Sequence, residues 1–436
     1  MKHSHEFRDP IHTFITVRSD ERKVINSRPF QRLRHIHQLA LTYFVYPGAT
    51  HKRFEHSLGV MHLASQIFDI ITSQGNIHSN IQYLIPDEDS LRYWRSVIRM
   101  AALCHDIGHL PFSHAAEHKL LPVDWDHERI TKELILSDEM KHIWQNMTPP
   151  LRPEDVVRLA IGVKKAPDLR FSIWETILSE VIVGDSFGAD RMDYLLRDSY
   201  RAGVQYGRFD HNRLINSIRI LPTSEKGSAE PALGIEQGGK EAAESLILAR
   251  YFIYKQVYFH HIRRVYDIHL IDFLQQWLPE GRFRTDNDGH LMNSDAEVIA
   301  AIRQCAADPA LPAHDPASRI QNRNHFRRVF SSVPGDKEGA IIQPGKALYD
   351  RACAQFDPAK LRYDYVPPKV SSPDFPVLLY DGTVASCLSL SQVMENIPTM
   401  EVDSIYCCNA ILPDVRQWLE QNKNQILALG GQEKLI

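Results

Sequence analysis

A histidine and an aspartate stand side by side at the end of an apolar run, and this pair constrains the fold more than any other feature of the chain. The run covers residues 97–104, and His105-Asp106 follows it directly. Polar groups in a segment patterned for burial cost stability unless something binds them. Imidazole and carboxylate are both ligands that divalent cations accept. The pattern predicts either a metal site cut into a core helix or a helix-end pair that hydrogen-bonds only within the protein.

Two further segments favour the metal. His56 begins an amphipathic stretch whose apolar residues recur near helical spacing. Asp190, Tyr194 and Asp198 recur every four residues in another helical stretch, so they share one face. Ligands from three helices that leave coordination positions open for water are typical of a hydrolytic site. The predicted metal ligands are His56, His105, Asp106 and Asp190.

At these positions the chain resembles the HD-domain phosphohydrolases, whose signature is H…HD…D. Longer motifs make it similar to one branch, the deoxynucleoside triphosphate (dNTP) triphosphohydrolases, which includes bacterial dNTPases and an animal enzyme with a sterile-alpha-motif domain. The resemblance covers about residues 6–270. The motifs that carry it are FRDPIH (7–12), FQRLR (30–34), YPGATHKRFEHSLG (46–59) and HDIGHLPFSH (105–114).

The resemblance implies catalytic roles for four more residues. His114 matches the histidine that protonates the departing 5′ oxygen, and Glu117 matches the carboxylate, more often Asp in the family, that orients it. A carboxylate three residues along a continuing helix turn suits that task, because it fixes the tautomer of the acid. His109 and His127 match further active-site histidines.

Substrate-binding residues are implied in the same way. Arginine suits a triphosphate because its planar fork donates two hydrogen bonds while staying charged. The positions that match triphosphate-binding residues are Arg53, Arg191 (often Lys in the family), Tyr194 and Arg250. The positions that match the walls of the sugar pocket are Gln38, Leu39, Asp198 and Tyr258. The tyrosines at 251, 254 and 258 are also typical of helix packing.

These residues together predict an enzyme. A bound divalent cation activates water, arginines and the cation stabilise developing charge, and a histidine protonates the leaving group. The residues alone indicate metal-dependent hydrolysis of a phosphoester or phosphoanhydride, whereas the resemblance implies attack on the α-phosphorus of a dNTP, giving deoxynucleoside and tripolyphosphate. The ligand set admits Mn, Fe, Co, Ni, Zn or Mg. Two alternatives are an HD-type phosphomonoesterase or phosphodiesterase acting on nucleotides or oligonucleotide ends, and a nucleotide-sensing scaffold with a degenerate site.

Regulation is expected to differ from that of the animal enzyme. There, an acidic residue ahead of FQRLR recognises an activating guanine, and Asn26 stands at the matching position here. An amide does not offer two acceptors to the guanine edge, so guanine-specific activation is not expected. Gln31, Arg32 and Arg34 keep an effector site for another nucleotide open. The resemblance also implies a homo-oligomer, and we expect His37 to face solvent.

The sequence predicts a mainly α fold: an HD-domain helical core with a small β-hairpin and a C-terminal α+β appendage. The hairpin is expected at 218–221 and 232–235. Prolines interrupt the helical pattern after residue 278, which predicts a core domain of 1–278 and a loop-rich region of 279–436. Apolar periodicity predicts helices at 20–40, 56–73, 91–107, 126–146, 153–163, 172–202 and 240–278.

Composition argues against several other classes of protein, and nucleic acid is not an expected partner, although local basic patches are left open. A formal net charge of −4 argues against a broadly basic nucleic-acid-binding surface. The six cysteines show no C-x-x-C spacing, so neither a zinc ribbon nor a disulfide framework is expected. No stretch approaches the roughly 20 apolar residues of a membrane span, and the first residues have no apolar signal core. A cytoplasmic protein with no membrane partner is expected.

Overall fold

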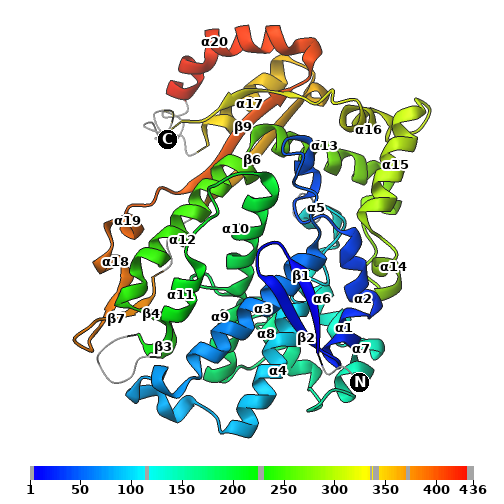
Figure 1. Ribbon diagram of the computed structural model, residues 1–436. Helices are drawn as coiled ribbons and strands as arrows, with labels where there is room; N and C mark the ends of the chain where they lie inside the picture. Colours follow the sequence, from blue (N-terminus) through cyan, green and yellow to red (C-terminus); the bar gives the residue numbers. More distant parts are fainter. Residues whose placement is uncertain are drawn as a thin grey trace. The chain divides into compact units, whose positions relative to one another are not determined.

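The computed structural model describes residues 4–112, 117–223, 230–333, 336, 343–369 and 374–429. It is mainly α-helical with a few small sheets, as the periodicity predicts (Figure 1). The chain forms two compact units that interleave along the sequence, whereas the sequence predicts one boundary after residue 278. The first unit comprises Met1–Ile253, Phe283–Val298 and Ser372–Ile397, and the second comprises Tyr254–Arg282, Ile299–Ser371 and Pro398–Ile436.

The first unit contains most of the helices. Its longest helix, α3, packs against α4 and α10, and α4 packs against α8. The helices of this unit are α1 (Glu21–Ile25), α2 (Arg28–Arg32), α3 (Arg53–Ile71), α4 (Glu88–Cys104), α5 (Glu117–Leu120), α6 (His127–Ile135), α7 (Asp138–Gln145), α8 (Pro153–Ile161), α9 (Ile173–Val183), α10 (Ala189–Ala202), α11 (His211–Ser217), α12 (Lys240–Ile253), α14 (Asn287–Leu291), α18 (Cys387–Leu390) and α19 (Gln392–Glu395).

Several predicted helices are divided, because local signals override the apolar periodicity. The range 126–146 breaks where Ser137 caps α7 by accepting the N–H of Met140. The range 172–202 breaks at Gly184, which ends α9 and whose Cβ, were it present, would overlap the carbonyl of Glu180. The range 20–40 contains only two short helices and 3₁₀ turns, and 240–278 is interrupted by a π-helix.

Two small sheets belong to the first unit. The predicted hairpin is present as β3 (Ile218–Pro222) and β4 (Pro231–Glu236), and the sheet continues through β7 (Pro376–Leu378) and β8 (Val384–Ser386) in the order β3-β4-β7-β8. An N-terminal hairpin, β1 (Ser4–Asp9) with β2 (Thr13–Arg18), was not predicted. Burial alternates only weakly between successive residues of β1, since most of this strand lies near the surface.

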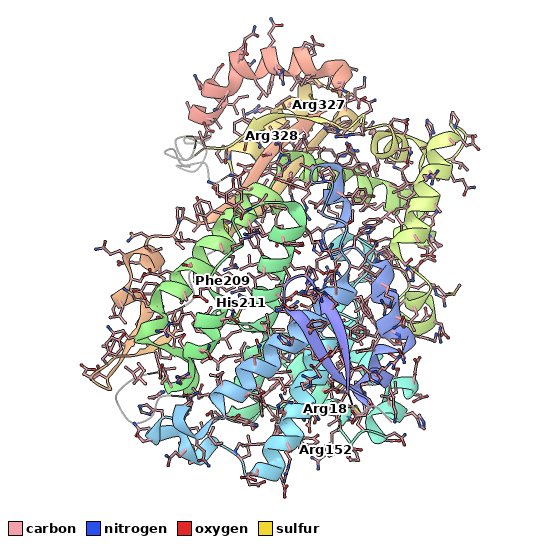
Figure 2. The ribbon with its side chains drawn as sticks, viewed as in Figure 1. Arg18, Arg152, Phe209, His211, Arg327 and Arg328 are labelled. Carbon is pink, nitrogen blue, oxygen red and sulfur yellow. The ribbon has the colours of Figure 1, made fainter. Side chains whose placement is uncertain are left out.

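The second unit is an α+β assembly around its own core. Its antiparallel sheet has the order β5-β9-β6, and Phe330, Leu361 and Ile405 form part of the core. The edge strand β5 carries Arg327 and Arg328, which are exposed (Figure 2). The elements are a π-helix (Tyr254–Tyr258), α13 (His261–Trp277), most of α15 (Asp295–Ala307), α16 (His314–Gln321), α17 (Pro344–Gln355), α20 (Leu412–Leu429), β5 (Arg327–Ser331), β6 (Leu361–Lys369) and β9 (Met400–Cys407).

Among the helices of the described ranges, none combines the length and the apolar character needed to cross a bilayer.

Close packing of α3 on α10 depends on a glycine. A Cβ at Gly59 would overlap the Asp193 carboxylate and the Arg197 guanidinium. We predict that Gly59→Ala lowers the free energy of unfolding, because overpacking costs about 1–3 kcal/mol and exceeds the gain of about 1 kcal/mol in helix propensity. Thermal or denaturant unfolding measures this effect. Gly75→Ala is the matched control, since a Cβ there meets nothing within 4 Å; equal stability of the two variants would contradict the prediction.

Candidate active site

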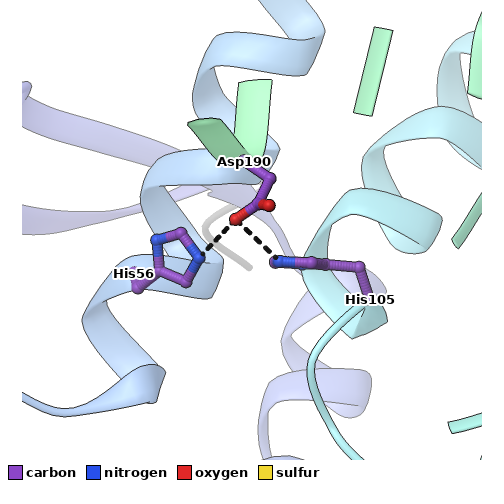
Figure 3. A group of neighbouring side chains, drawn as sticks. All are labelled: His56, His105 and Asp190. Atoms are coloured by element: carbon purple, nitrogen blue, oxygen red, sulfur yellow. Dashed lines mark hydrogen bonds and ion pairs between the residues drawn. The ribbon is translucent and has the colours of Figure 1, made fainter. Parts of the chain in front are cut away.

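Three side chains from three different segments meet at the centre of the first unit. His56 lies on α3, His105 follows α4 directly, and Asp190 lies in the first turn of α10. The Asp190 Oδ1 atom is 3.0 Å from His56 Nε2 and 3.5 Å from His105 Nε2 (Figure 3). One donor atom from each residue lies within 4.8 Å of the others, so the three form a group that could hold a metal ion.

Both imidazoles are oriented so that Nε2 faces this group. His56 Nδ1 lies 2.8 Å from Asp193 Oδ2, and His105 Nδ1 lies 2.8 Å from the carbonyl of Ala102. An acceptor at Nδ1 fixes the tautomer and leaves the Nε2 lone pair available for a cation. The Nε2 atom of His105 is buried and has no hydrogen-bond partner. A divalent cation fits this donor set, because it would satisfy the orphaned nitrogen.

A buried charge network supports His56 from behind. Asp193 is fully buried and lies 2.7 Å from His12 Nε2 as well as beside His56. Arg197 donates to Asp193 from Nε at 2.8 Å and to Asp9 from Nη1 at 2.7 Å. Burial would raise the pKa of Asp193, but Arg197 and the two histidines outweigh it and hold the pKa well below its usual range. Asp193 is therefore a carboxylate that stays charged.

Asp106 lies next to the three-residue group. It forms an ion pair with Arg53, and its Oδ1 lies 3.1 Å from His109 Nε2 and 3.4 Å from His105 Nε2. Burial would raise its pKa, but His105, His109 and Arg53 together lower it well below the usual value. Asp106 thus adds a second ionised carboxylate to the site, and Arg53 partly balances its charge.

A second pair of histidines lies beside Asp106. The rings of His109 and His127 stack at a centroid distance of 3.9 Å with an interplanar angle of 12°. Burial and the neighbouring Arg53 keep the pKa of His109 well below its usual value, whereas Glu117 outweighs burial and raises the pKa of His127. The two adjacent imidazoles therefore differ in basicity, and His127 takes up a proton more readily than His109. His114 lies outside the described residues.

Glu117 contacts His127. Its Oε1 accepts from His127 Nδ1 at 2.8 Å and also from the His127 backbone N–H. Glu128 Oε2 lies 3.1 Å from the same Nδ1. The sequence predicts that Glu117 orients His114. Within the described residues, Glu117 positions His127.

A cavity of about 760 Å³ adjoins the candidate metal donors, within the range of about 300–1,000 Å³ typical of ligand pockets. Its walls include apolar residues of α8, α9 and β4, and both of its lysines are paired: Lys164 with Asp185, and Lys165 with Asp126 and Glu128. The site residues that line it are His105, Asp106, His127 and Asp190.

The predicted triphosphate residues of the first unit lie outside this cavity lining. Arg53 is buried against Asp106, and Arg191 Nη2 lies 3.3 Å from Asp185 Oδ1. Tyr194 on α10 and Arg250 on α12 are half-buried. Their roles stay predictions.

Three predicted sugar-pocket residues are buried in the first unit. His51 joins two of them, because its carbonyl accepts the Gln38 N–H at 3.0 Å and its Nε2 lies 2.7 Å from Asp198 Oδ1. Gln38 Oε1 is buried without a hydrogen-bond partner, and Leu39 is buried beside it in sequence. The fourth residue, Tyr258, belongs to the second unit.

The arginines of the possible effector site, Arg32 and Arg34, differ in solvent exposure. Arg34 is exposed and its Nε donates to Gln31 Oε1 at 3.0 Å. Arg32 is buried, and its guanidinium donates at 2.7 Å to the carbonyls of His109 and Asn293. Arg32 therefore serves the internal structure of the site.

The residues that support His56 are not predicted from the sequence. No role is predicted for Asp193, His12 or Arg197, although FRDPIH and the stretch around Asp190 are motifs. A usable signal was present: Asp193 and Arg197 are four residues apart and share a helix face.

We predict that Asp193→Asn weakens metal binding about 10- to 100-fold, as loss of a carboxylate behind a ligating histidine does. Titration with a competing chelator measures the affinity. Asp69→Asn, at an exposed carboxylate paired with Arg95, serves as the control. Unchanged affinity in the Asp193 variant would show that the carboxylate does not orient His56.

Metal affinity should also rise with pH. Burial would lower the pKa of metal-free His56, but hydrogen bonds to Asp190 and Asp193 raise it to about 10. Because a cation must displace that proton, apparent affinity should increase up to about tenfold per pH unit below this pKa. Chelator competition between about pH 7 and pH 9 checks the slope, and a flat profile would rule out proton release.

Comparison with known proteins identifies related chains. The HD domain matches residues 53–167, and the HD associated region matches residues 209–346. The uncharacterized protein YwfO of Bacillus subtilis is 35% identical over 272 residues, 62% of this chain and 55% of that protein. Deoxynucleoside triphosphate triphosphohydrolase SAMHD1 of Homo sapiens is 30% identical over 289 residues, 61% of this chain and 43% of that protein.

A solved structure matches over nearly the whole chain. The crystal structure of a hypothetical protein from Aquifex aeolicus has a TM-score of 0.77 and 31% sequence identity, and the match covers 95% of this chain and 100% of that chain. In contrast, the chain spans about half the length of the curated relatives named above. From the motif, the fold and these matches, the chain belongs to the HD-domain family and joins an HD domain to an HD associated region.

Proposed function

We propose that this protein is a metal-dependent phosphohydrolase that converts dNTPs to deoxynucleoside and tripolyphosphate. The observation that carries the proposal is the convergence of His56 Nε2, His105 Nε2 and Asp190 on one point, with Asp106 beside them. The SAMHD1 relatives of Gallus gallus and Homo sapiens, which are named as deoxynucleoside triphosphate triphosphohydrolases, support the choice of substrate. An intact donor set, in which both histidines are buried and Asp190 is half-buried, argues against a scaffold with a degenerate site.

The cation would be held by His56, His105, Asp106 and Asp190. When bound, a divalent ion supplies a water of lowered pKa and polarises the phosphoryl group. The chain's own residues then have three tasks: to fix the two imidazoles, to neutralise the phosphates and to move a proton. Asp193 and the Ala102 carbonyl perform the first task by holding the Nδ1 atoms.

Charge stabilisation falls to the arginines around the site. Arg53 is buried against Asp106, and its guanidinium is proposed to stabilise negative charge that develops near the cation. Arg191 and Arg250 are proposed to bind the outer phosphates. A chain of phosphates needs several cations, whereas a monoester needs fewer, and this difference favours a polyphosphate substrate.

Proton transfer is proposed to use His114 and His127. His114 is proposed to protonate the leaving oxygen. Glu117 raises the pKa of His127, which favours its protonated form as a hydrogen-bond donor to the phosphoryl group, and His109 orients Asp106. An imidazole with a raised pKa suits general acid catalysis near neutral pH.

Homo-oligomerisation, an effector nucleotide and a cytoplasmic location stay predictions from the sequence.

We predict that the metal-loaded protein releases tripolyphosphate from dNTPs and that Asp190→Asn lowers the rate at least about 10³-fold, because the variant loses an anionic ligand and the charge stabilisation that depends on it. Ion chromatography of the phosphate products, with each dNTP separately, measures the reaction. Asp168→Asn, at an exposed carboxylate paired with Lys132, should keep full activity.

The products distinguish the alternatives. Orthophosphate release from nucleoside monophosphates, with no tripolyphosphate from any dNTP, would indicate a phosphomonoesterase. Cleavage of oligonucleotide ends alone would indicate a phosphodiesterase. Absence of any turnover in metal-saturated protein would contradict an enzymatic function.

A further inference from the structure

A lysine, a histidine and an aspartate form a chain of contacts at the start of α3. Lys52, which directly precedes α3, has its Nζ atom 2.7 Å from His37 Nε2. His37 Nδ1 in turn lies 2.6 Å from Asp295 Oδ2. All three residues belong to the first unit, Asp295 through the segment Phe283–Val298. An amine beside a base that a carboxylate orients is an arrangement that activates nucleophiles.

The backbone holds the lysine opposite the histidine. His37 and Lys52 are partners in an isolated antiparallel bridge. On either side of it, the Gln38 N–H and the Arg53 N–H each donate at 3.0 Å to a carbonyl of the opposite segment. Side chains of directly opposed residues lie close together on one face. The contact between the amine and the imidazole is therefore set by paired backbone as well as by the lysine side chain.

Asp295 fixes the orientation of His37. Asp295 is almost fully buried, at 1% exposed. Its Oδ1 accepts the Phe112 N–H at 3.0 Å, and its Oδ2 accepts the His37 backbone N–H at 2.7 Å. An acceptor at Nδ1 leaves the Nε2 lone pair of the imidazole facing Lys52. The His37 side chain is only 13% exposed, so the expectation that it faces solvent is wrong.

Lys52 differs from other lysines of the chain in its partner. Lys132 and Lys164 form ion pairs with carboxylates. Within the described residues, Lys52 Nζ contacts an imidazole instead. Burial lowers the pKa of Lys52, and Asp295 offsets this effect only in part. The side chain is half-buried, so part of it is open to solvent.

We propose that Lys52 is an acylation site, at which His37 acts as the base and Asp295 orients His37. The acyl donor is an acyl phosphate, whose phosphate departs as an anion and needs no general acid. Nζ forms a bond to the acyl carbon, and the bond between that carbon and the phosphate oxygen breaks. The electron pair of the broken bond leaves with the phosphate, and the Nζ proton passes to His37 Nε2. The product is a neutral amide one residue before Arg53.

Acetyl phosphate and mass spectrometry that resolves each lysine test this site. Lys52 should be acetylated at least about tenfold faster than Lys164, because a positioned base accelerates proton transfer. Lys164 is 83% exposed and paired with Asp185, and it serves as the internal control in every digest. His37→Ala should slow acetylation of Lys52 at least about tenfold and leave Lys164 unchanged.

Asp295→Asn should also slow acetylation of Lys52, because an amide stabilises a protonated imidazole less than a carboxylate does.

The pH profile distinguishes an activated lysine from one that is only accessible. An amine must lose its proton to react, and burial lowers the pKa of Lys52, so its rate should level off at a lower pH than that of Lys164. Besides the imidazole, the titratable groups near Lys52 are Asp295, Tyr43 and Glu55, the last bonded to the Lys52 backbone N–H. Burial raises the pKa of Tyr43 to about 12, so it stays neutral over this range.

Equal acetylation rates for Lys52 and Lys164 in the wild-type protein would overturn the proposal, and so would parallel pH profiles. An unchanged Lys52 rate in His37→Ala protein would do the same. If His37→Ala lowers the unfolding temperature, Asp295→Asn and the wild-type pH profile decide the question. Because no readout depends on dNTP hydrolysis, failure of the proposed function and failure of this proposal are distinguishable.

Discussion

The contact between His56 and two aspartates is the interaction on which the rest of the site depends. Asp193 lies 2.8 Å from Nδ1 and Asp190 lies 3.0 Å from Nε2, so the ring is held between two carboxylates in the protein interior. Burying such groups is costly unless each is paired. Arg197 provides the pairing for Asp193, while Asp190 and His105 face a point where a cation would complete the balance.

Close packing of α10 on α3 makes this arrangement possible. Gly59 lets α10 approach α3 closely enough for Asp193 and Arg197 to lie against the turn that follows His56. The first turn of the same α10 carries Asp190, so one helix supplies both a metal donor and the carboxylate behind a second donor. The stability of the core and the chemistry of the site therefore rest on the same helix pair, and a change at their contact affects both.

The sequence predicted the helical fold and pointed to His56, His105 and Asp190, which lie together in the structure, but it did not predict the contacts that support them. His56, His105 and Asp190 were recognisable because the HD motif and helical periodicity are local signals. The contacts of Asp295 were not recognisable in the sequence, because its hydrogen-bond partners Phe112 and His37 are distant along the chain. A single buried carboxylate has no local signature. Helix boundaries failed for a related reason: caps such as Ser137 and the close approach at Gly184 end helices where apolar periodicity continues.

A divalent cation is expected between the two Nε2 atoms, and anomalous diffraction at a metal absorption edge locates it. Crystals of protein purified with Mn²⁺ should show one strong anomalous peak within coordination distance of His56, His105 and Asp190, about 2.0–2.3 Å from each donor. A site filled by water alone at saturating metal, or a peak that contacts none of these three residues, would show that these side chains do not form a metal site.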